Sequence, residues 1–230
     1  MSSVRNLGAY FDERMSMVEH VNRLVRPCFY QLRRVQFIRR SLTTMTATRL
    51  MNSFIIARVD YCNSVLAGLS KQQLARIQSV LNVAARIIFG HARFDHITPT
   101  LRTRLHWLKV PQLMEFKRCL LVYKALHWQA PAYIASFCSE VSSPRRLQSS
   151  SHHRLQILPL AKTVKLGERS FAIGGPSAWN NLPDAVKESE ILESFKQRLK
   201  TLIFNLPQQT YVDMTMLSAL DFGLGRAMAL

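Results

Sequence analysis

The sequence predicts a mainly α-helical fold with a stray N-terminal strand and a small, irregular α/β piece near its C-terminal end. Apolar residues recur at steps of three and four through most of positions 18–126, which is the spacing of amphipathic helices. Serine, threonine or proline stands where several of these segments begin, as at helix N-termini. Hydrophobic residues make up 48% of the 230 residues, which is ordinary for a globular protein and excludes intrinsic disorder.

The first element is short. Residues 4–11 (VRNLGAYF) form a mixed apolar segment that predicts one strand without a nearby hairpin partner. A lone strand cannot satisfy its backbone ladder, so we expect it to belong to a sheet that this chain mostly lacks. Its unpaired edge predicts self-association of the chain, which deletion of residues 1–13 should reduce.

A long helix with one basic face is predicted next. Ser16 and Glu19 have the spacing of a capping box, and Pro27 is expected to kink the helix. The predicted core stripe consists of Val18, Val21, Val25, Cys28, Leu32 and Val35. At 100° per residue, the opposite face carries Arg23, Arg26, Arg33 and Arg34. We expect these arginines to lack compensating acids at i±4 and to be free to contact phosphates.

Further helices follow at short intervals. One is predicted over residues 44–59, with core residues Ala47, Leu50, Met51, Phe54 and Ile55. The next begins at Ser70 with Gln73 in capping-box spacing, ends at Gly90, and has a core stripe of Leu74, Ile77, Leu81, Ala84 and Ile88. Proline predicts three more starts, at residues 99, 111 and 131. The packed side of the helix after residue 111 is predicted as Leu113, Phe116, Leu120, Tyr123 and Lys124.

The last third of the chain has a different pattern. Residues 139–154 are rich in serine and predict a linker, and residues 155–160 and 163–166 are strand candidates. Residues 174–176 (GGP) predict a turn, and residues 178–183 predict a compact helical turn. A last amphipathic helix is predicted from Leu192, Phe195, Leu199, Leu202 and Ile203. Residues 207–230 have little pattern and are expected to be poorly ordered.

The charge is strongly unbalanced. The chain carries 31 Lys+Arg against 14 Asp+Glu, a formal net charge of +17. Residues 1–110 hold 17 of the basic residues but only 5 of the acidic ones. An excess of this size favours a polyanionic partner, and we place RNA, DNA or an RNA–DNA hybrid ahead of an anionic membrane. No run of 18 apolar residues and no signal-peptide pattern is present, so we expect a soluble, intracellular protein in the nucleus or cytoplasm.

Candidate catalytic and metal-binding groups are scarce. The four cysteines form no C-x-x-C motif and are expected to be reduced, and the adjacent pair His152-His153 is not expected to hold a metal. Neither a G-x-S-x-G motif nor a P-loop occurs. Asp60 stands alone and is interpreted as a helix cap or salt-bridge partner, and Asp95-His96 and residues 105–107 as packing. We therefore predict no catalytic residue, metal or cofactor in this chain.

Four sequence blocks nevertheless have the residues and the spacing of blocks in a known family. Residues 58–66 (RVDYCNSVL) are similar to its R-x-D-Y-C-N-S-L-L block, and residues 95–99 (DHITP) with 105–108 (LHWL) are similar to the next. The two later blocks are matched by short motifs at 116–117 (FK), 123–126 (YKAL), 130–133 (APAY), 167–171 (GERSF), 175–176 (GP), 179–183 (WNNLP), 195–196 (FK) and 199–201 (LKT). Order and spacing agree over about residues 4–206, and the chain thereby resembles the reverse transcriptases of non-LTR (LINE-type, jockey-like) retrotransposons.

The resemblance implies a place within a larger enzyme. Residues 1–13 would be the last strand of a palm domain, and residues 14–90 a thumb-like helical bundle, which in the family grips the primer–template duplex. Residues 91–138 would be a helical post-polymerase segment, 139–154 a linker, 155–206 a small α/β piece and 207–230 a tail. The family's Asp-Asp catalytic loop would lie upstream of residue 1, and this chain has no Asp-Asp pair.

Two functions remain open on the sequence. The first is a non-catalytic, C-terminal part of an RNA-directed DNA polymerase that binds nucleic acid without sequence preference through its basic helical surface. The alternative is a domesticated helical module that binds a protein partner through apolar surface exposed by loss of the palm. Salt distinguishes them, because arginine–phosphate binding weakens steeply with salt and apolar association does not.

Overall fold

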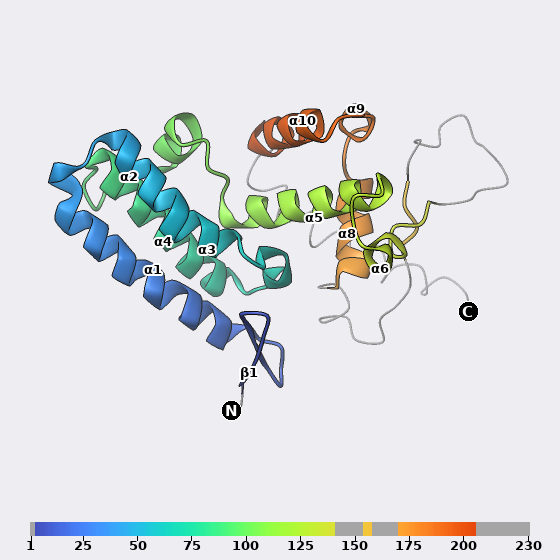
Figure 1. Ribbon diagram of the computed structural model, residues 1–230, viewed down its shortest axis with the longest axis horizontal. Helices are drawn as coiled ribbons and strands as arrows, with labels where there is room; N and C mark the ends of the chain where they lie inside the picture. Colours follow the sequence, from blue (N-terminus) through green and yellow to red (C-terminus); the bar gives the residue numbers. More distant parts are fainter. Residues whose placement is uncertain (1–2, 141–153, 158–169, 206–230) are drawn as a thin grey trace, which may run out of the picture. The chain divides into compact units, whose positions relative to one another are not determined.

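A computed structural model describes residues 3–140, 154–157 and 170–205 (Figure 1). The chain is mainly helical with one short sheet at its N-terminal end, as the sequence predicted. It divides into two compact units, residues 1–114 and 115–230, so the division falls inside one helix, α5 (Val110–Leu126).

The N-terminal element of the first unit is a β-hairpin, so the prediction of a single unpartnered strand is wrong. Strands β1 (Ser3–Asn6) and β2 (Ala9–Asp12) are antiparallel, with Val4 opposite Phe11. The two turn residues, Leu7 and Gly8, both have positive φ, 45° and 84°. Hairpin turns of this kind normally have Asn-Gly or Asp-Gly at these two positions. Because leucine stands at the first position here, the sequence does not predict a hairpin.

Helix α1 (Val18–Ile38) begins without the predicted capping box. The carboxylate of Asp12 instead accepts hydrogen bonds from the Ser16 hydroxyl and from the backbone N–H of Met17, the latter at 3.2 Å. Met17 has a left-handed φ of 59° and is the N-cap. Glu19 is unavailable for the box because its carboxylate binds Arg23.

The predicted core stripe of α1 is largely confirmed. Its buried apolar residues are Val21, Val25, Cys28, Leu32 and Val35, whereas Val18 at the start of the helix is 39% exposed. The helix continues through Pro27, and the predicted kink there stays a prediction.

The second predicted helix is interrupted by a π-helical turn. It consists of α2 (Thr44–Met51), η2 (Asn52–Ile56) and α3 (Ala57–Asp60), and the Thr43 side chain caps its start. Its buried residues are spaced four apart: Ala47, Met51, Ile55 and Val59. A π turn contains more residues than an α turn, so every fourth residue of this segment points into the core. Phe54 lies outside that row and is 41% exposed. The placement of Phe54 in the core was therefore wrong.

Helix α4 (Lys71–Phe89) agrees with the sequence at both ends. Ser70 accepts a hydrogen bond from the Gln73 N–H, and Gly90 is a left-handed C-cap with φ 70°. The helix lies parallel to α1: Arg76 binds Asn22 near the two N-termini, and Arg39 donates to the carbonyls of Ile87 and Ile88 near the two C-termini. The α2–α3 segment runs back between these ends, which gives a three-helix bundle (Figure 1).

Short helical turns complete the first unit: η1 (Arg39–Ser41), η3 (Asn63–Leu66) and η4 (Thr100–Arg104). The larger apolar cluster of this unit joins α1, η2, α3 and α4, and Leu32, Ile55, Leu81 and Ile88 are among its fully buried members. A smaller cluster consists of Ala85, Ile97 and Leu101.

The second unit is described in α5 from Glu115 and in α6 (Ala132–Ala135), α8 (Phe171–Asn180), α9 (Asp184–Lys187) and α10 (Leu192–Asn205). Its core is aromatic. The Tyr123 ring stacks between His127 and Phe195, with centroids 3.9 and 4.2 Å away, and its hydroxyl donates to the backbone carbonyls of Ser189 and Glu190. Trp179 is buried beside Phe195.

Two predictions in this unit need correction. The segment Gly174–Pro176 is not a turn but lies inside α8, where a Cβ on Gly175 would come within 2.9 Å of the Phe171 ring. Burial of this helix therefore overrides the turn signal of the Gly-Gly-Pro sequence. Of the predicted packed side of α5, only Tyr123 is fully buried; the other buried residues of α5 are Val110, Met114, Cys119, Val122 and Ala125.

Several predictions fall outside the described residues. These are most of the linker at 139–154, the His152-His153 pair, most of the two strand candidates and the tail at 207–230. Next to them, Glu140 and Leu155 form an isolated antiparallel bridge, and the Asn180 amide bonds both backbone groups of Leu155. The last helix, α10, was predicted correctly, with Phe195, Leu199 and Ile203 buried.

Candidate nucleic-acid interface

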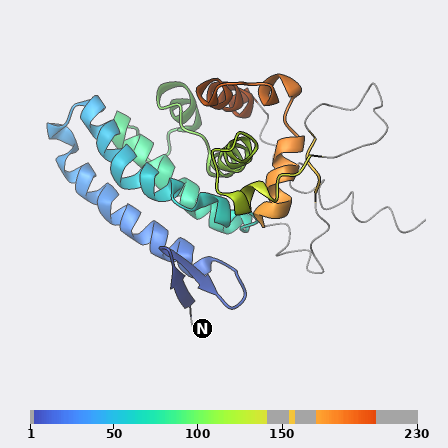
Figure 2. The same cartoon turned by 45° about the vertical axis from the view of Figure 1, so that its right-hand side comes forward.

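The outer face of α1 is the candidate interface. Helices α2, α3 and α4 lie on one side of α1, and the opposite side is turned away from the bundle (Figures 1 and 2). All four predicted arginines, Arg23, Arg26, Arg33 and Arg34, are exposed on that opposite side. Arg23 and Arg34 are eleven residues apart, which corresponds to about 16 Å along the helix axis.

Arg23 differs from the other three, and the expectation that it lacks a compensating acid is wrong. Its Nε lies 2.6 Å from a carboxylate oxygen of Glu19, one helical turn earlier. Its guanidinium also lies over the Tyr10 ring, 4.3 Å from the centroid. The hydrogen bond to Glu19 raises the pKa of Arg23. Both side chains remain about half exposed, so the pair is a weak surface salt bridge that a phosphate can displace.

The other three arginines keep their positive charge uncompensated. Arg26 and Arg33 make no hydrogen bond or ion pair with any residue that the structure describes. Arg34 lies over the Tyr30 ring, 5.8 Å from the centroid, a contact that leaves its N–H groups available. Arg26, Arg33 and Arg34 therefore present donors to solvent along one face of α1.

Two exposed aromatic residues that were not predicted lie on the same face of α1. Tyr30 is 61% exposed and Phe37 is 90% exposed. At 100° per residue, they fall between the arginines, and all six side chains occupy a sector of about 100°. We call this set of six, Arg23, Arg26, Tyr30, Arg33, Arg34 and Phe37, the α1 stripe. Its spacing of three, four and seven residues was visible in the sequence.

A nearby arginine serves the fold instead. The Arg39 guanidinium donates to the carbonyls of Ile87, Ile88 and Leu42 at 2.9, 2.5 and 2.7 Å. It thereby satisfies carbonyl groups at the C-terminal end of α4, where a positive charge also complements the helix dipole. Arg39 is accordingly not part of the α1 stripe.

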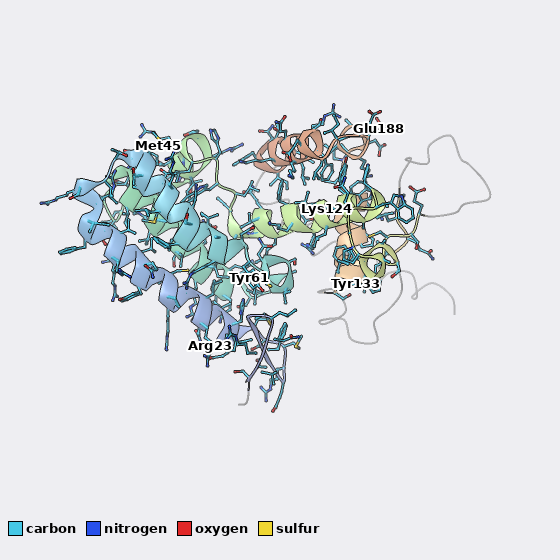
Figure 3. The ribbon with its side chains drawn as sticks, viewed as in Figure 1. Arg23, Met45, Tyr61, Lys124, Tyr133 and Glu188 are labelled. Atoms are coloured by element: carbon cyan, nitrogen blue, oxygen red, sulfur yellow. The ribbon has the colours of Figure 1, made fainter. Side chains whose placement is uncertain are left out.

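A pocket of about 330 Å³ lies at the Arg23 end of the stripe, between the hairpin, α1 and α3. Tyr10, His20, Arg23, Arg58 and Tyr61 are among its lining residues. The Tyr61 hydroxyl donates to the Leu7 carbonyl at 2.6 Å and fixes the hairpin turn against α3 (Figure 3). Burial lowers the pKa of His20, so this side chain is neutral near pH 7 and the positive charge here belongs to the two arginines.

The residues considered for catalysis have structural roles. Asp60 accepts a hydrogen bond from the Asn63 amide at 3.2 Å, as a local cap. Asp95 accepts from the backbone N–H of Ala92 and lies 3.4 Å from His91 rather than orienting His96. Within the described ranges, no group of three His, Cys, Asp or Glu side chains could hold a metal ion.

The cysteines are all unpaired thiols. Burial raises the pKa of Cys28 and of Cys138 to about 11, and it raises the pKa of Cys119 as well. Since the thiolate is the reactive form, these three side chains are inert at neutral pH and act as small apolar residues.

No protein family, curated protein or solved structure matches this chain. The resemblance to non-LTR reverse transcriptases therefore rests on the sequence blocks alone. Among the described residues, no helix has the length and apolar character needed to cross a membrane.

Proposed function

We propose that the chain binds nucleic acid without sequence preference through the α1 stripe, as a non-catalytic, thumb-like part of a non-LTR retrotransposon reverse transcriptase. The observation that carries the binding proposal is the row of three uncompensated arginines, Arg26, Arg33 and Arg34, on the side of α1 opposite its buried stripe.

The chemistry of the stripe fits phosphate contacts. A guanidinium presents a planar set of donors that matches phosphate oxygens, and phosphate contacts carry no sequence information by themselves. The excess of 17 basic over 5 acidic residues in positions 1–110 adds a long-range attraction to the polyanion. Binding at these groups therefore depends on charge and not on base identity, and it would operate in a compartment that contains nucleic acid.

The test is a salt titration of the purified chain with labelled 20-nucleotide RNA of two unrelated sequences, read by fluorescence anisotropy. We expect similar Kd values for both sequences. We also expect the Kd to rise steeply with salt concentration, because arginines that bind phosphates release counterions from them. A Kd that is insensitive to salt, or that differs tenfold between the sequences, contradicts it.

A second candidate function is supported by the hairpin. Val4 is 67% exposed and Leu7 is 84% exposed, so this element presents apolar side chains and unpaired strand edges to a partner. A protein-interaction module would bind through this surface with little dependence on salt, and Val4→Lys would weaken that binding without changing the affinity for RNA.

A further inference from the structure

We infer that the α1 stripe takes single-stranded nucleic acid, with unpaired bases stacking on Tyr30 and Phe37. This inference rests on the proposed function and names its substrate class. It starts from the exposure of the two rings, 61% and 90%, on a helix whose other face is fully packed. An exposed aromatic ring offers a flat apolar face on which another flat, apolar group can stack.

The arginines beside the two rings favour a ligand that is both aromatic and negatively charged. Each ring has arginines one helical turn away: Arg26, Arg33 and Arg34 for Tyr30, and Arg33 and Arg34 for Phe37. Arg34 already lies over the Tyr30 ring. A ligand that stacks on these rings is thus held within reach of fixed positive charges. A single strand of nucleic acid has both flat bases that can stack on the rings and phosphates that can bind the arginines. Proteins that bind single strands without sequence preference combine aromatic and basic side chains in this way.

The spacing agrees with a strand that follows the helix. Tyr30 and Phe37 are seven residues apart, which corresponds to about 10 Å along the axis. That distance lies within the reach of a few nucleotides of a flexible single strand, so two bases of one strand can reach the two rings. In a duplex the base faces are covered by their neighbours in the stack, and only the phosphates remain for the arginines. Charged side chains separate the two rings, so they do not form the contiguous apolar patch of a protein interface.

The variant for the test is Tyr30→Leu with Phe37→Leu. Leucine keeps apolar bulk and helix propensity but removes the aromatic face. Circular dichroism verifies that the variant is folded. The matched control is Phe94→Leu, because Phe94 is 93% exposed and has Arg93 over its ring, yet lies outside α1.

Binding is measured by anisotropy with a 20-nucleotide oligo(U) and with a 20-base-pair RNA duplex at one salt concentration. We expect the Kd for oligo(U) to rise about tenfold for each ring replaced and the Kd for the duplex to change less than twofold. The control should change neither. An unchanged Kd for oligo(U), or an equal loss with the duplex, overturns the inference. If the unaltered chain binds neither oligonucleotide, the proposed function itself fails, which is a separate result.

A second measurement needs no variant. Oligo(U) in which 5-iodouracil replaces uracil cross-links under ultraviolet light to aromatic rings on which its bases stack. We expect mass spectrometry of the unaltered chain to find cross-links at Tyr30 and Phe37. Cross-links confined to other aromatic residues, or a loss of self-association in the double variant with no loss of RNA binding, would instead assign the rings to another role and overturn the inference.

Discussion

Replacing Arg39 by methionine should destabilise the first unit, and the structure gives the size of the effect. The guanidinium is half-buried and makes three hydrogen bonds to backbone carbonyls, two of them at the end of α4. A hydrogen bond to a charged group contributes about 1.5–3 kcal/mol, but water can replace part of it at a half-buried site. The favourable position at a helix C-terminus adds about 0.3–1 kcal/mol. For three hydrogen bonds these contributions would reach about 5–10 kcal/mol if none were replaced. Because water can take over most of the bonding at this half-buried site, we expect Arg39→Met to lower the free energy of unfolding by about 2–3 kcal/mol.

The matched control is the next residue. Arg40 is exposed and has no hydrogen bond or ion pair with any described residue, so Arg40→Met should change the free energy of unfolding by less than about 0.5 kcal/mol. Both variants are compared with the unaltered chain by urea denaturation followed by far-ultraviolet circular dichroism. If Arg39→Met unfolds at the same urea concentration as Arg40→Met, Arg39 does not join α1 to α4 in the way described.

Three further predictions concern acid stability, catalysis and self-association. Because burial lowers the pKa of His20, this imidazole takes up a proton more readily in the unfolded chain, and the free energy of unfolding should fall as pH drops below about 6.5. Urea denaturation at several pH values should show a smaller fall for His20→Gln than for the unaltered chain. An equal fall in both proteins would contradict a buried, neutral imidazole. The purified chain should extend no primer on an RNA template with magnesium or manganese, since no Asp-Asp pair is present, and incorporation of labelled nucleotide above a blank would refute this. Val4→Lys on the exposed face of β1 should reduce self-association in light scattering, because lysine on an edge strand opposes pairing between chains; a monomeric unaltered chain would count against it.

The helices could be predicted wherever apolar spacing and capping residues agreed. The buried rows of α1 and α4 follow the apolar spacing of the sequence. Ser70 caps the N-terminus of α4 and Gly90 caps its C-terminus, as predicted. The failures occur where tertiary contacts decide the local structure. Leu7 takes a positive φ that its side chain disfavours, and the Tyr61 hydrogen bond to its carbonyl holds the turn in place.

Two other failures have the same kind of cause. Asp12, at the end of the hairpin, replaces the predicted capping box because the fold brings its carboxylate to the start of α1. The π turn at Asn52–Ile56 shifts the buried positions of this helix by one residue, and no residue type in the segment predicts such a turn.

The candidate site was only partly predictable. The exposure of the four arginines follows from helical periodicity, and the structure agrees with it. The pairing of Arg23 with Glu19 and the position of Tyr30 and Phe37 between the arginines were also present in the spacing, but neither was predicted. The sequence could not show that Arg39 belongs to the fold, because its partners in α4 are 48 and 49 residues away.

The central claim is that the arginines of the α1 stripe contact phosphates. The most direct measurement is the slope of log Kd against log salt for a single-stranded oligonucleotide, with the unaltered chain and with the triple variant Arg26→Gln, Arg33→Gln and Arg34→Gln. Glutamine keeps helix propensity and removes the charge. At about 0.7 per single-strand contact, loss of three contacts should flatten the slope by about 2. Adding Arg23→Gln should flatten it by less than one further contact, because Glu19 already offsets that charge.

The control variant carries Arg49→Gln and Arg93→Gln, two exposed arginines outside α1, and should have a slope closer to that of the unaltered chain. The account predicts that the triple variant remains helical by circular dichroism, binds all sequences more weakly and has the flatter slope. A folded triple variant whose slope equals that of the unaltered chain would show that these arginines only keep α1 in water, and would contradict the account.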